Sequence, residues 1–171
     1  MKRLFFALWP TQTSRDQIQL VSDAFQQDTT RQVPKHNLHI TLFFIGNIDH
    51  QNIPLLMEKA SLIRNSKIAL VFNELDFWRR PKILCLSCQR QTTPLYQLVN
   101  SLNQLAKTLS FQIESRPFRA HITIARKAHC RPKSVFEPIE MCFDRFSLIE
   151  STSTEEGVLY SELCSWPLGE E

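Results

Sequence analysis

Two short stretches, His39-Ile40-Thr41-Leu42 and His121-Ile122-Thr123-Ile124, decide the fold of this chain. Both follow the pattern histidine, apolar, threonine, apolar, and both lie in runs rich in β-branched and aromatic residues, which is typical of strands. Side chains of a strand alternate between its two faces, so each histidine shares a face with its threonine. We therefore expect each strand to bury its aliphatic face and to present an imidazole beside a hydroxyl.

The two motifs predict an internal pseudo-repeat. Their histidines are 82 positions apart, about half of the 171 residues, although the halves are not otherwise visibly alike. Strands and helices are interleaved along the chain. We predict an α+β fold over 1–171 with two pseudo-symmetric lobes. Each lobe is an antiparallel sheet with outer helices, and the lobes face each other across a central cleft within a single domain.

Other elements follow from apolar periodicity. Besides the motif strands, the pattern predicts strands over 3–8, 67–75, 83–88, 141–150 and 158–166. It predicts helices over 11–27, 52–64 and 93–109, each with a proline at or near its start. In the first strand, Arg3, Phe5 and Ala7 share one face and Leu4, Phe6 and Leu8 the other. Segment 28–35 is expected to be a polar loop, 77–82 a turn and 126–133 a basic loop.

Composition indicates a globular protein. Hydrophobic residues make up 43% of the chain and charged residues 22%. The formal net charge of +3 permits an anionic ligand but does not by itself indicate a nucleic-acid binder. No apolar run is long enough to cross a bilayer, and we interpret the short one near Met1 as a strand. We expect no membrane partner and a monomer.

The five cysteines are scattered and odd in number, which argues against a disulfide framework and favours a reducing compartment, the cytoplasm. Cys85 and Cys88 form a C-x-x-C pattern inside a predicted strand, where positions three apart face opposite ways. His129 and Cys130 are conceivable partners in a zinc site. We expect buried thiols instead, and no metal or other cofactor.

Paired histidines suit a displacement at phosphorus. The imidazole pKa lies near 6.5, so at neutral pH one histidine can accept a proton while a protonated partner donates one. Thr41 and Thr123 offer hydroxyl donors to phosphate oxygens, and Arg126 offers a guanidinium fork or merely solvates a strand end. Phe5 and Trp78 are candidates to stack on a nucleobase, with ordinary core packing as the alternative for each ring.

These residues resemble a known family, the two-histidine phosphoesterases, and within it the RNA 2′,3′-cyclic phosphodiesterases, also called 2′-5′ RNA ligases. The resemblance covers nearly the whole chain. It rests on Arg3-Leu4-Phe5-Phe6-Ala7, Asn37-Leu38-His39-Ile40-Thr41-Leu42, Gly46, Arg116-Pro117-Phe118, His121-Ile122-Thr123-Ile124, Arg126, Ser151, Gly157, Tyr160, Leu163 and Trp166-Pro167-Leu168.

The resemblance implies metal-independent hydrolysis of RNA 2′,3′-cyclic phosphate ends, such as those of tRNA fragments, to 2′-phosphates. It implies His39 as proton donor and His121 as proton acceptor, with reversible 2′-5′ ligation using the same groups, and it adds Arg116 as a candidate RNA contact. One departure is visible, because Ala120 stands where the family usually has proline. Two alternatives stay open: a cyclic phosphodiesterase for a small nucleotide, and an RNA- or nucleotide-binding relative without turnover.

Overall fold

The computed structural model describes residues 1–25, 30–133, 135–155 and 157–169. Its helices are α1 (Gln12–Ala24), α2 (Ile53–Ala60) and α3 (Thr93–Thr108), with short 3₁₀ turns at Lys35–Asn37 and His50–Asn52. Its strands are β1 (Lys2–Leu8), β2 (Arg31–Gln32), β3 (Ile40–Ile48), β4 (Ile68–Phe72), β5 (Glu74–Trp78), β6 (Ile83–Ser87), β7 (His121–Arg126), β8 (Ile139–Phe143), β9 (Arg145–Thr154) and β10 (Gly157–Pro167). No helix among these residues is long and apolar enough to cross a membrane.

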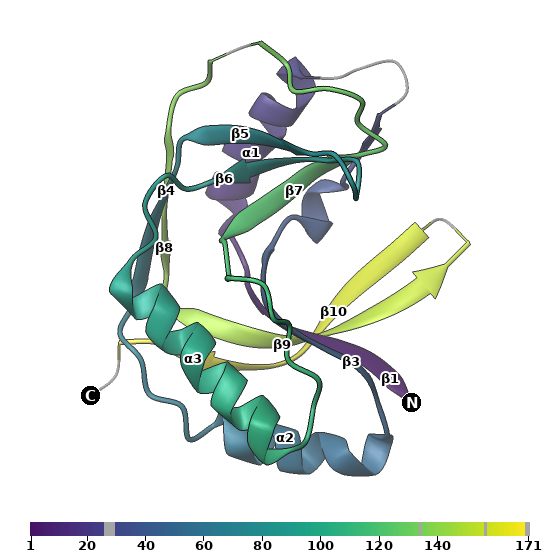
Figure 1. Cartoon of the computed structure of the whole chain (residues 1–171), viewed down its shortest axis with the longest axis vertical. Coiled ribbons are helices and arrows are strands. Elements are labelled where there is room, and N and C mark those ends of the chain that lie inside the picture. The colour runs from purple at the N-terminus through teal and green to yellow at the C-terminus, as the bar shows by residue number, and fades with distance from the viewer. Residues whose placement is uncertain (26–29, 134, 156, 170–171) are drawn as a thin grey trace.

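One large antiparallel sheet organises the molecule. Within the described residues it runs in the order β10-β9-β1-β3-β7-β6-β5, with the short β2 paired to β7. In Figure 1, β5, β6 and β7 lie in the upper half of the molecule and β1, β3, β9 and β10 in the lower half. The halves meet where β3 pairs with β7 at a single position, Ile40 opposite Ile122. The predicted α+β class is confirmed, and the sheets of the two lobes are continuous through this junction.

The halves are not contiguous in sequence. β1 lies between β3 and β9, so the lower half combines the first strands of the chain with its last hairpin. The upper half is built from the middle of the chain. α1 packs against β7 and β8, and α3 packs against β3, which puts a helix against each half.

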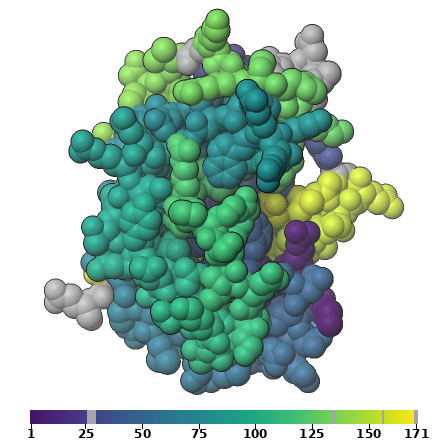
Figure 2. Space-filling model, in the orientation of Figure 1, coloured from purple at the N-terminus to yellow at the C-terminus, as the bar shows by residue number. Residues whose placement is uncertain are grey.

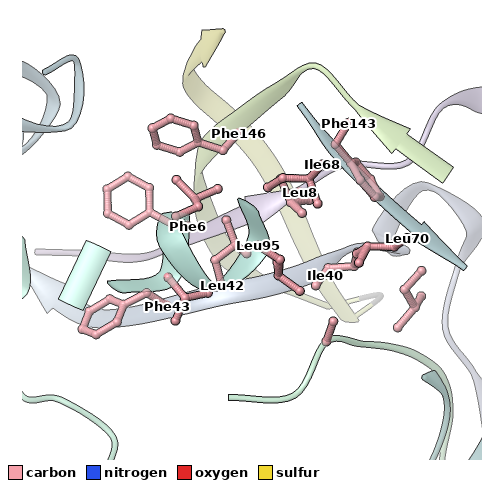
Figure 3. Packing of buried hydrophobic residues seen from close by; sticks show 14 of the residues in the cluster. Phe6, Leu8, Ile40, Leu42, Phe43, Ile68, Leu70, Leu95, Phe143 and Phe146 are labelled. Carbon is pink, nitrogen blue, oxygen red and sulfur yellow. The ribbon is translucent and has the colours of Figure 1, made fainter. Parts of the chain in front are cut away.

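The main core lies on the face of the large sheet that these helices cover. Figure 3 shows Phe6 and Leu8 from β1 meeting Ile40 and Leu42 from β3, with Leu95 of α3 beside them. The predicted faces of β1 are confirmed: Leu4, Phe6 and Leu8 enter this core, while Phe5 and Ala7 join a separate small cluster with Ile149. Both faces of β1 are therefore buried.

Two predicted strands are wrong in the same way. The segment 67–75 divides at Asn73 into β4 and β5, and 141–150 divides at Asp144 into β8 and β9. In each case the first strand pairs in a separate two-stranded sheet, β4-β8, and the second joins the large sheet. Apolar residues lie on both sides of each break. Buried strands of either sheet carry the same types of residue, so the sequence does not show where the chain passes from one sheet to the other.

Several boundaries also differ. The predicted helix 52–64 is the shorter α2, since residues 61–64 leave the helix after Ala60. β2 occupies part of the predicted loop 28–35, and residues 28 and 29 lie outside the described residues. Trp78, expected in a turn, ends β5 opposite Ile83. α1 begins at the N-cap Thr11, whose hydroxyl accepts a hydrogen bond from the Ser14 backbone at 3.2 Å.

Candidate active site

The pairing of β3 with β7 brings the two motifs together. Because Ile40 is paired with Ile122 in an antiparallel pair, the motif histidines on either side of this position are brought near each other, and the charge of His121 acts on His39. Ile40 and Ile122 are fully buried in the core, so the four polar side chains occupy the opposite side of the sheet. We call this side the histidine face. The pairing of β3 with β7 therefore brings the two motifs to one site, as we predict.

His39 is held at both ring nitrogens. Nδ1 lies 2.6 Å from the Asn37 carbonyl oxygen, and because a carbonyl only accepts, Nδ1 carries a proton. Nε2 lies 2.9 Å from Thr41 Oγ1. In the neutral ring Nε2 accepts from that hydroxyl, and in the imidazolium it becomes a donor. Asn37 is itself anchored, since its side-chain amide donates to the Val158 carbonyl of β10 at 2.7 Å.

Aromatic rings surround His39. Its ring centroid is 5.0 Å from Phe5, 4.9 Å from Tyr160 and 5.8 Å from Trp9, which stacks on it at an interplanar angle of 15°. These rings belong to the small cluster on the histidine face, with Ile149 and Ala7 beneath them. Together with the Asn37 contact, they restrict the imidazole to one orientation.

His121 repeats the first contact of His39. Its Nδ1 lies 2.9 Å from the carbonyl oxygen of Arg119, again two residues upstream, so Nδ1 donates and Nε2 keeps its lone pair. The ring of Trp78 lies 4.4 Å from the ring of His121, centroid to centroid. His121, like His39, therefore carries a proton on Nδ1 and, in the neutral ring, leaves Nε2 as the acceptor.

An ion-pair network holds Arg119. Its Nη2 lies 2.8 Å from Asp76 Oδ2 and 3.1 Å from Glu74 Oε2 on β5, and donates to Ser87 Oγ at 3.3 Å. Ser87 in turn donates to Asp76 at 2.6 Å. β5 and β6 thereby fix the residue whose carbonyl orients His121.

Ala120 has a partner for the N–H that proline would lack. Its backbone N–H donates to the side-chain oxygen of Gln91, just before α3, at 2.8 Å. Ala120 is 0% exposed, so water does not replace this contact. Gln91 and Arg119 thus anchor the backbone that enters the second motif.

Both imidazoles favour the neutral form. Burial lowers the pKa of His39 to about 4, with smaller contributions from the charges of His121 and Arg126, against the raising effect of the Asn37 carbonyl. Burial also lowers the pKa of His121, and the Arg119 carbonyl opposes the shift. The positive charge of Arg126 is near enough to His39 to contribute to lowering the pKa of that imidazole.

The remaining predicted residues lie in different settings. Thr123 is half-buried and, among the described residues, its hydroxyl has no hydrogen-bond partner. Phe5 is 2% exposed beneath His39, so it has no open face for a nucleobase and packing is the alternative that its position supports. Arg116 is exposed and paired with Glu114, whose charge raises the pKa of His121.

Trp9, Arg119 and Gln91 were not predicted from the sequence, and Tyr160 entered only through the family resemblance. Trp9 continues the parity of Arg3, Phe5 and Ala7 in the first strand, and that signal was available. Arg119 and Gln91 support the site through contacts with residues that are distant in sequence, so no local sequence pattern identifies them.

The two cysteines of the C-x-x-C pattern are buried thiols. Burial raises the pKa of Cys85 and of Cys88 to about 12, so both thiols stay protonated. Within the part of the chain that the structure describes, no group of three or more His, Cys, Asp or Glu side chains is arranged to hold a metal ion.

Comparisons with known proteins agree with this geometry. A family model described as the 2′-5′ RNA ligase superfamily matches residues 10–155. The RNA 2′,3′-cyclic phosphodiesterase of Escherichia coli (strain K12) is 33% identical over 129 residues, 74% of this chain and 73% of that protein. The protein of the same name from Thermotoga maritima is 30% identical over 143 residues, 77% of this chain and 75% of that protein. The crystal structure of E. coli LigT complexed with 3′-AMP has a TM-score of 0.88 at 28% identity and covers 99% of both chains.

Proposed function

This chain belongs to the 2′-5′ RNA ligase superfamily, the family that its motifs resemble, and we propose on that footing that it is a hydrolase that opens RNA 2′,3′-cyclic phosphate ends to 2′-phosphates. The observation that carries the proposal is the pairing of Ile40 with Ile122, which sets both His–Thr pairs on one face. The names of the relatives in Escherichia coli and Thermotoga maritima support the same reaction.

The proposed reaction divides two proton transfers between the histidines. Nε2 of His121 removes a proton from water as its oxygen attacks phosphorus. The bond from phosphorus to the 3′ oxygen breaks, and Nε2 of protonated His39 gives that oxygen a proton. In ligation a 5′-hydroxyl replaces water: His121 removes its proton, the bond from phosphorus to the 3′ oxygen again breaks with a proton from His39, and a 2′-5′ bond forms. Cleavage of that bond is the reverse step, in which the two histidines exchange roles.

A bound phosphate supplies the charge that this scheme needs. An anion beside His39 raises its pKa from about 4, and the imidazolium then donates at Nε2 instead of accepting from Thr41. The Thr41 hydroxyl is released toward the phosphate, where Thr123 and Arg126 also offer donors. Substrate binding and protonation of the acid are therefore coupled.

The residues present also bear on the metal requirement, the domain organisation and the location of the protein. The two imidazoles and neighbouring donors account for every proton transfer, so we propose that turnover needs no metal. We propose a single two-lobed domain that acts as a monomer on RNA. We also propose a cytoplasmic location, because Cys85, Cys88, Cys142 and Cys164 carry free thiols.

The test offers EDTA-treated protein an oligoribonucleotide that ends in a 2′,3′-cyclic phosphate. We expect hydrolysis to a 2′-phosphate, with most turnover lost in His39→Ala, in His121→Ala and to a similar extent in the double variant, because the two groups act as a unit. His50→Ala, an exposed histidine on another turn, is the matched control. Hydrolysis of only a small cyclic nucleotide, or binding without turnover, would establish the corresponding alternative instead.

A further inference from the structure

Two basic segments that are far apart in sequence meet at one end of the upper half. The β5–β6 turn carries Arg79 and Lys82, and the loop after β7 carries Lys127 and Arg131. The N–H of Ala128 in that loop donates to the Lys82 carbonyl at 3.0 Å. In Figure 2 the light-green segment after β7 lies against the teal β5–β6 region at the top of the molecule.

The meeting of these segments involves an unusual backbone. Lys82 has φ of 51° and Lys127 has φ of 57°, both in the left-handed region that side chains other than glycine seldom adopt. Lysine therefore occupies two backbone positions at which glycine would be less strained.

A hollow of about 590 Å³ lies between the two segments. We call it the basic hollow. It is lined by Asp76, Phe77, Arg79, Lys82, Ala128, His129, Cys130 and Arg131. Among the lining residues that the structure describes, the one carboxylate is that of Asp76, which is already paired with Arg119 at 2.8 Å. Within the described residues, Arg79, Lys82 and Arg131 form no ion pair, so the hollow presents three cations without compensating charge.

The basic hollow adjoins the histidine face on both of its walls. Arg79 directly follows Trp78, whose ring lies 4.4 Å from His121. Lys82 directly precedes Ile83, which pairs with Arg126 on β7. A chain of phosphates that ends at the two histidines can therefore pass Trp78 and Arg126 and reach the hollow within the next nucleotides.

We propose that the basic hollow binds the phosphodiester backbone of the single-stranded RNA that leads up to the cyclic end. The inference rests on the proposed function and extends it from the terminal phosphate to the strand behind it. Guanidinium and ammonium groups bind phosphates without reading sequence, so the hollow selects for a polynucleotide over a mononucleotide and not for particular bases.

The test compares two substrates with the same terminal nucleotide: a nucleoside 2′,3′-cyclic monophosphate and a pentaribonucleotide with a 2′,3′-cyclic end. In Arg79→Ala/Arg131→Ala, the ratio of kcat/KM for the pentanucleotide to kcat/KM for the monophosphate is expected to fall roughly ten- to hundredfold. The dependence of log(kcat/KM) on log[salt] for the pentanucleotide is expected to become shallower by about 0.7 for each phosphate that the variant no longer binds.

A second hollow provides the matched control. It lies near α3 and is lined in part by Arg64 and Lys67, so Arg64→Ala/Lys67→Ala removes the same formal charge without touching the basic hollow. The control is expected to leave the substrate ratio unchanged. An equal fall in the control, or no fall in Arg79→Ala/Arg131→Ala, overturns the inference.

Binding separates this inference from the proposed function. Fluorescence anisotropy with a labelled pentaribonucleotide that ends in a 3′-phosphate reports on the hollow without turnover. Absence of hydrolysis of both cyclic substrates by the wild type would refute the proposed function. Equal affinities of wild type and Arg79→Ala/Arg131→Ala for the pentaribonucleotide would refute the basic hollow as a backbone site.

Discussion

Replacing Gln91 with alanine is expected to loosen the entrance to the second motif. The side-chain oxygen of Gln91 accepts from the N–H of Ala120, which is 0% exposed and has no route to water. A buried donor left without a partner costs about 1–3 kcal/mol, so the free energy of unfolding should fall by that amount in Gln91→Ala. The carbonyl that orients His121 belongs to the preceding residue, and kcat/KM should therefore fall as well.

Proline at position 120 gives this prediction a direct check. Ala120→Pro removes the N–H, and with it the need for an acceptor, so Gln91→Ala should cost much less in that background. The coupling in the double-mutant cycle should be about 1–2 kcal/mol by urea unfolding. Gln91→Glu keeps an acceptor and should restore most of the stability and kcat/KM, and Gln89→Ala, an exposed neighbour, serves as control. An equal cost of Gln91→Ala with alanine and with proline at position 120 would refute this role of the Gln91 side chain.

Three further predictions concern the histidine face. Thr41→Val and Thr123→Val each keep shape and β-branching but delete a hydroxyl donor, so each should lower kcat/KM roughly ten- to hundredfold. Unchanged kcat/KM in both variants would remove the hydroxyls from the phosphate site. Between about pH 6.5 and 4 the unfolded chain binds a proton at His39 that the folded protein does not, so the free energy of unfolding should fall by about 1–3 kcal/mol as pH drops through that window, and His39→Gln should show a shallower decline in urea titrations. A bound phosphate raises the pKa of both histidines, so the kcat profile should be bell-shaped and lie at higher pH than the kcat/KM profile; a kcat that only rises with pH would argue against a protonated donor.

The histidine motifs were predictable because their information is local. Alternation along a strand is enough to place His39 with Thr41 and His121 with Thr123, and the same alternation separated Phe6 from Phe5 in β1. α3 was predictable to within one residue, since Pro94 marks its start and a leucine stripe marks its buried face.

The breaks at Asn73 and Asp144 were not predictable from pattern. Phe72 and Leu75 are both buried, in different sheets, so the apolar rhythm continues across a point where the backbone changes partners. The support of His121 was hidden for a related reason. Arg119 is 45 residues from Glu74, and a charge pair at that separation leaves no periodic signal in the sequence.

The place of β1 between β3 and β9 has a consequence for synthesis on the ribosome. When the nascent chain has been made as far as β7, both histidines exist, but β1 still has one open edge, because β9 and β10 come from the last part of the chain. The hydrogen bond from the Asn37 side-chain amide to the Val158 carbonyl likewise cannot form until β10 has been synthesised. Closure must therefore pair the start of the chain with its end, the most distant kind of contact and the slowest to form. The strands of the upper half have all been synthesised when the chain reaches Arg126, whereas the lower half cannot be completed until β9 and β10 have left the ribosome.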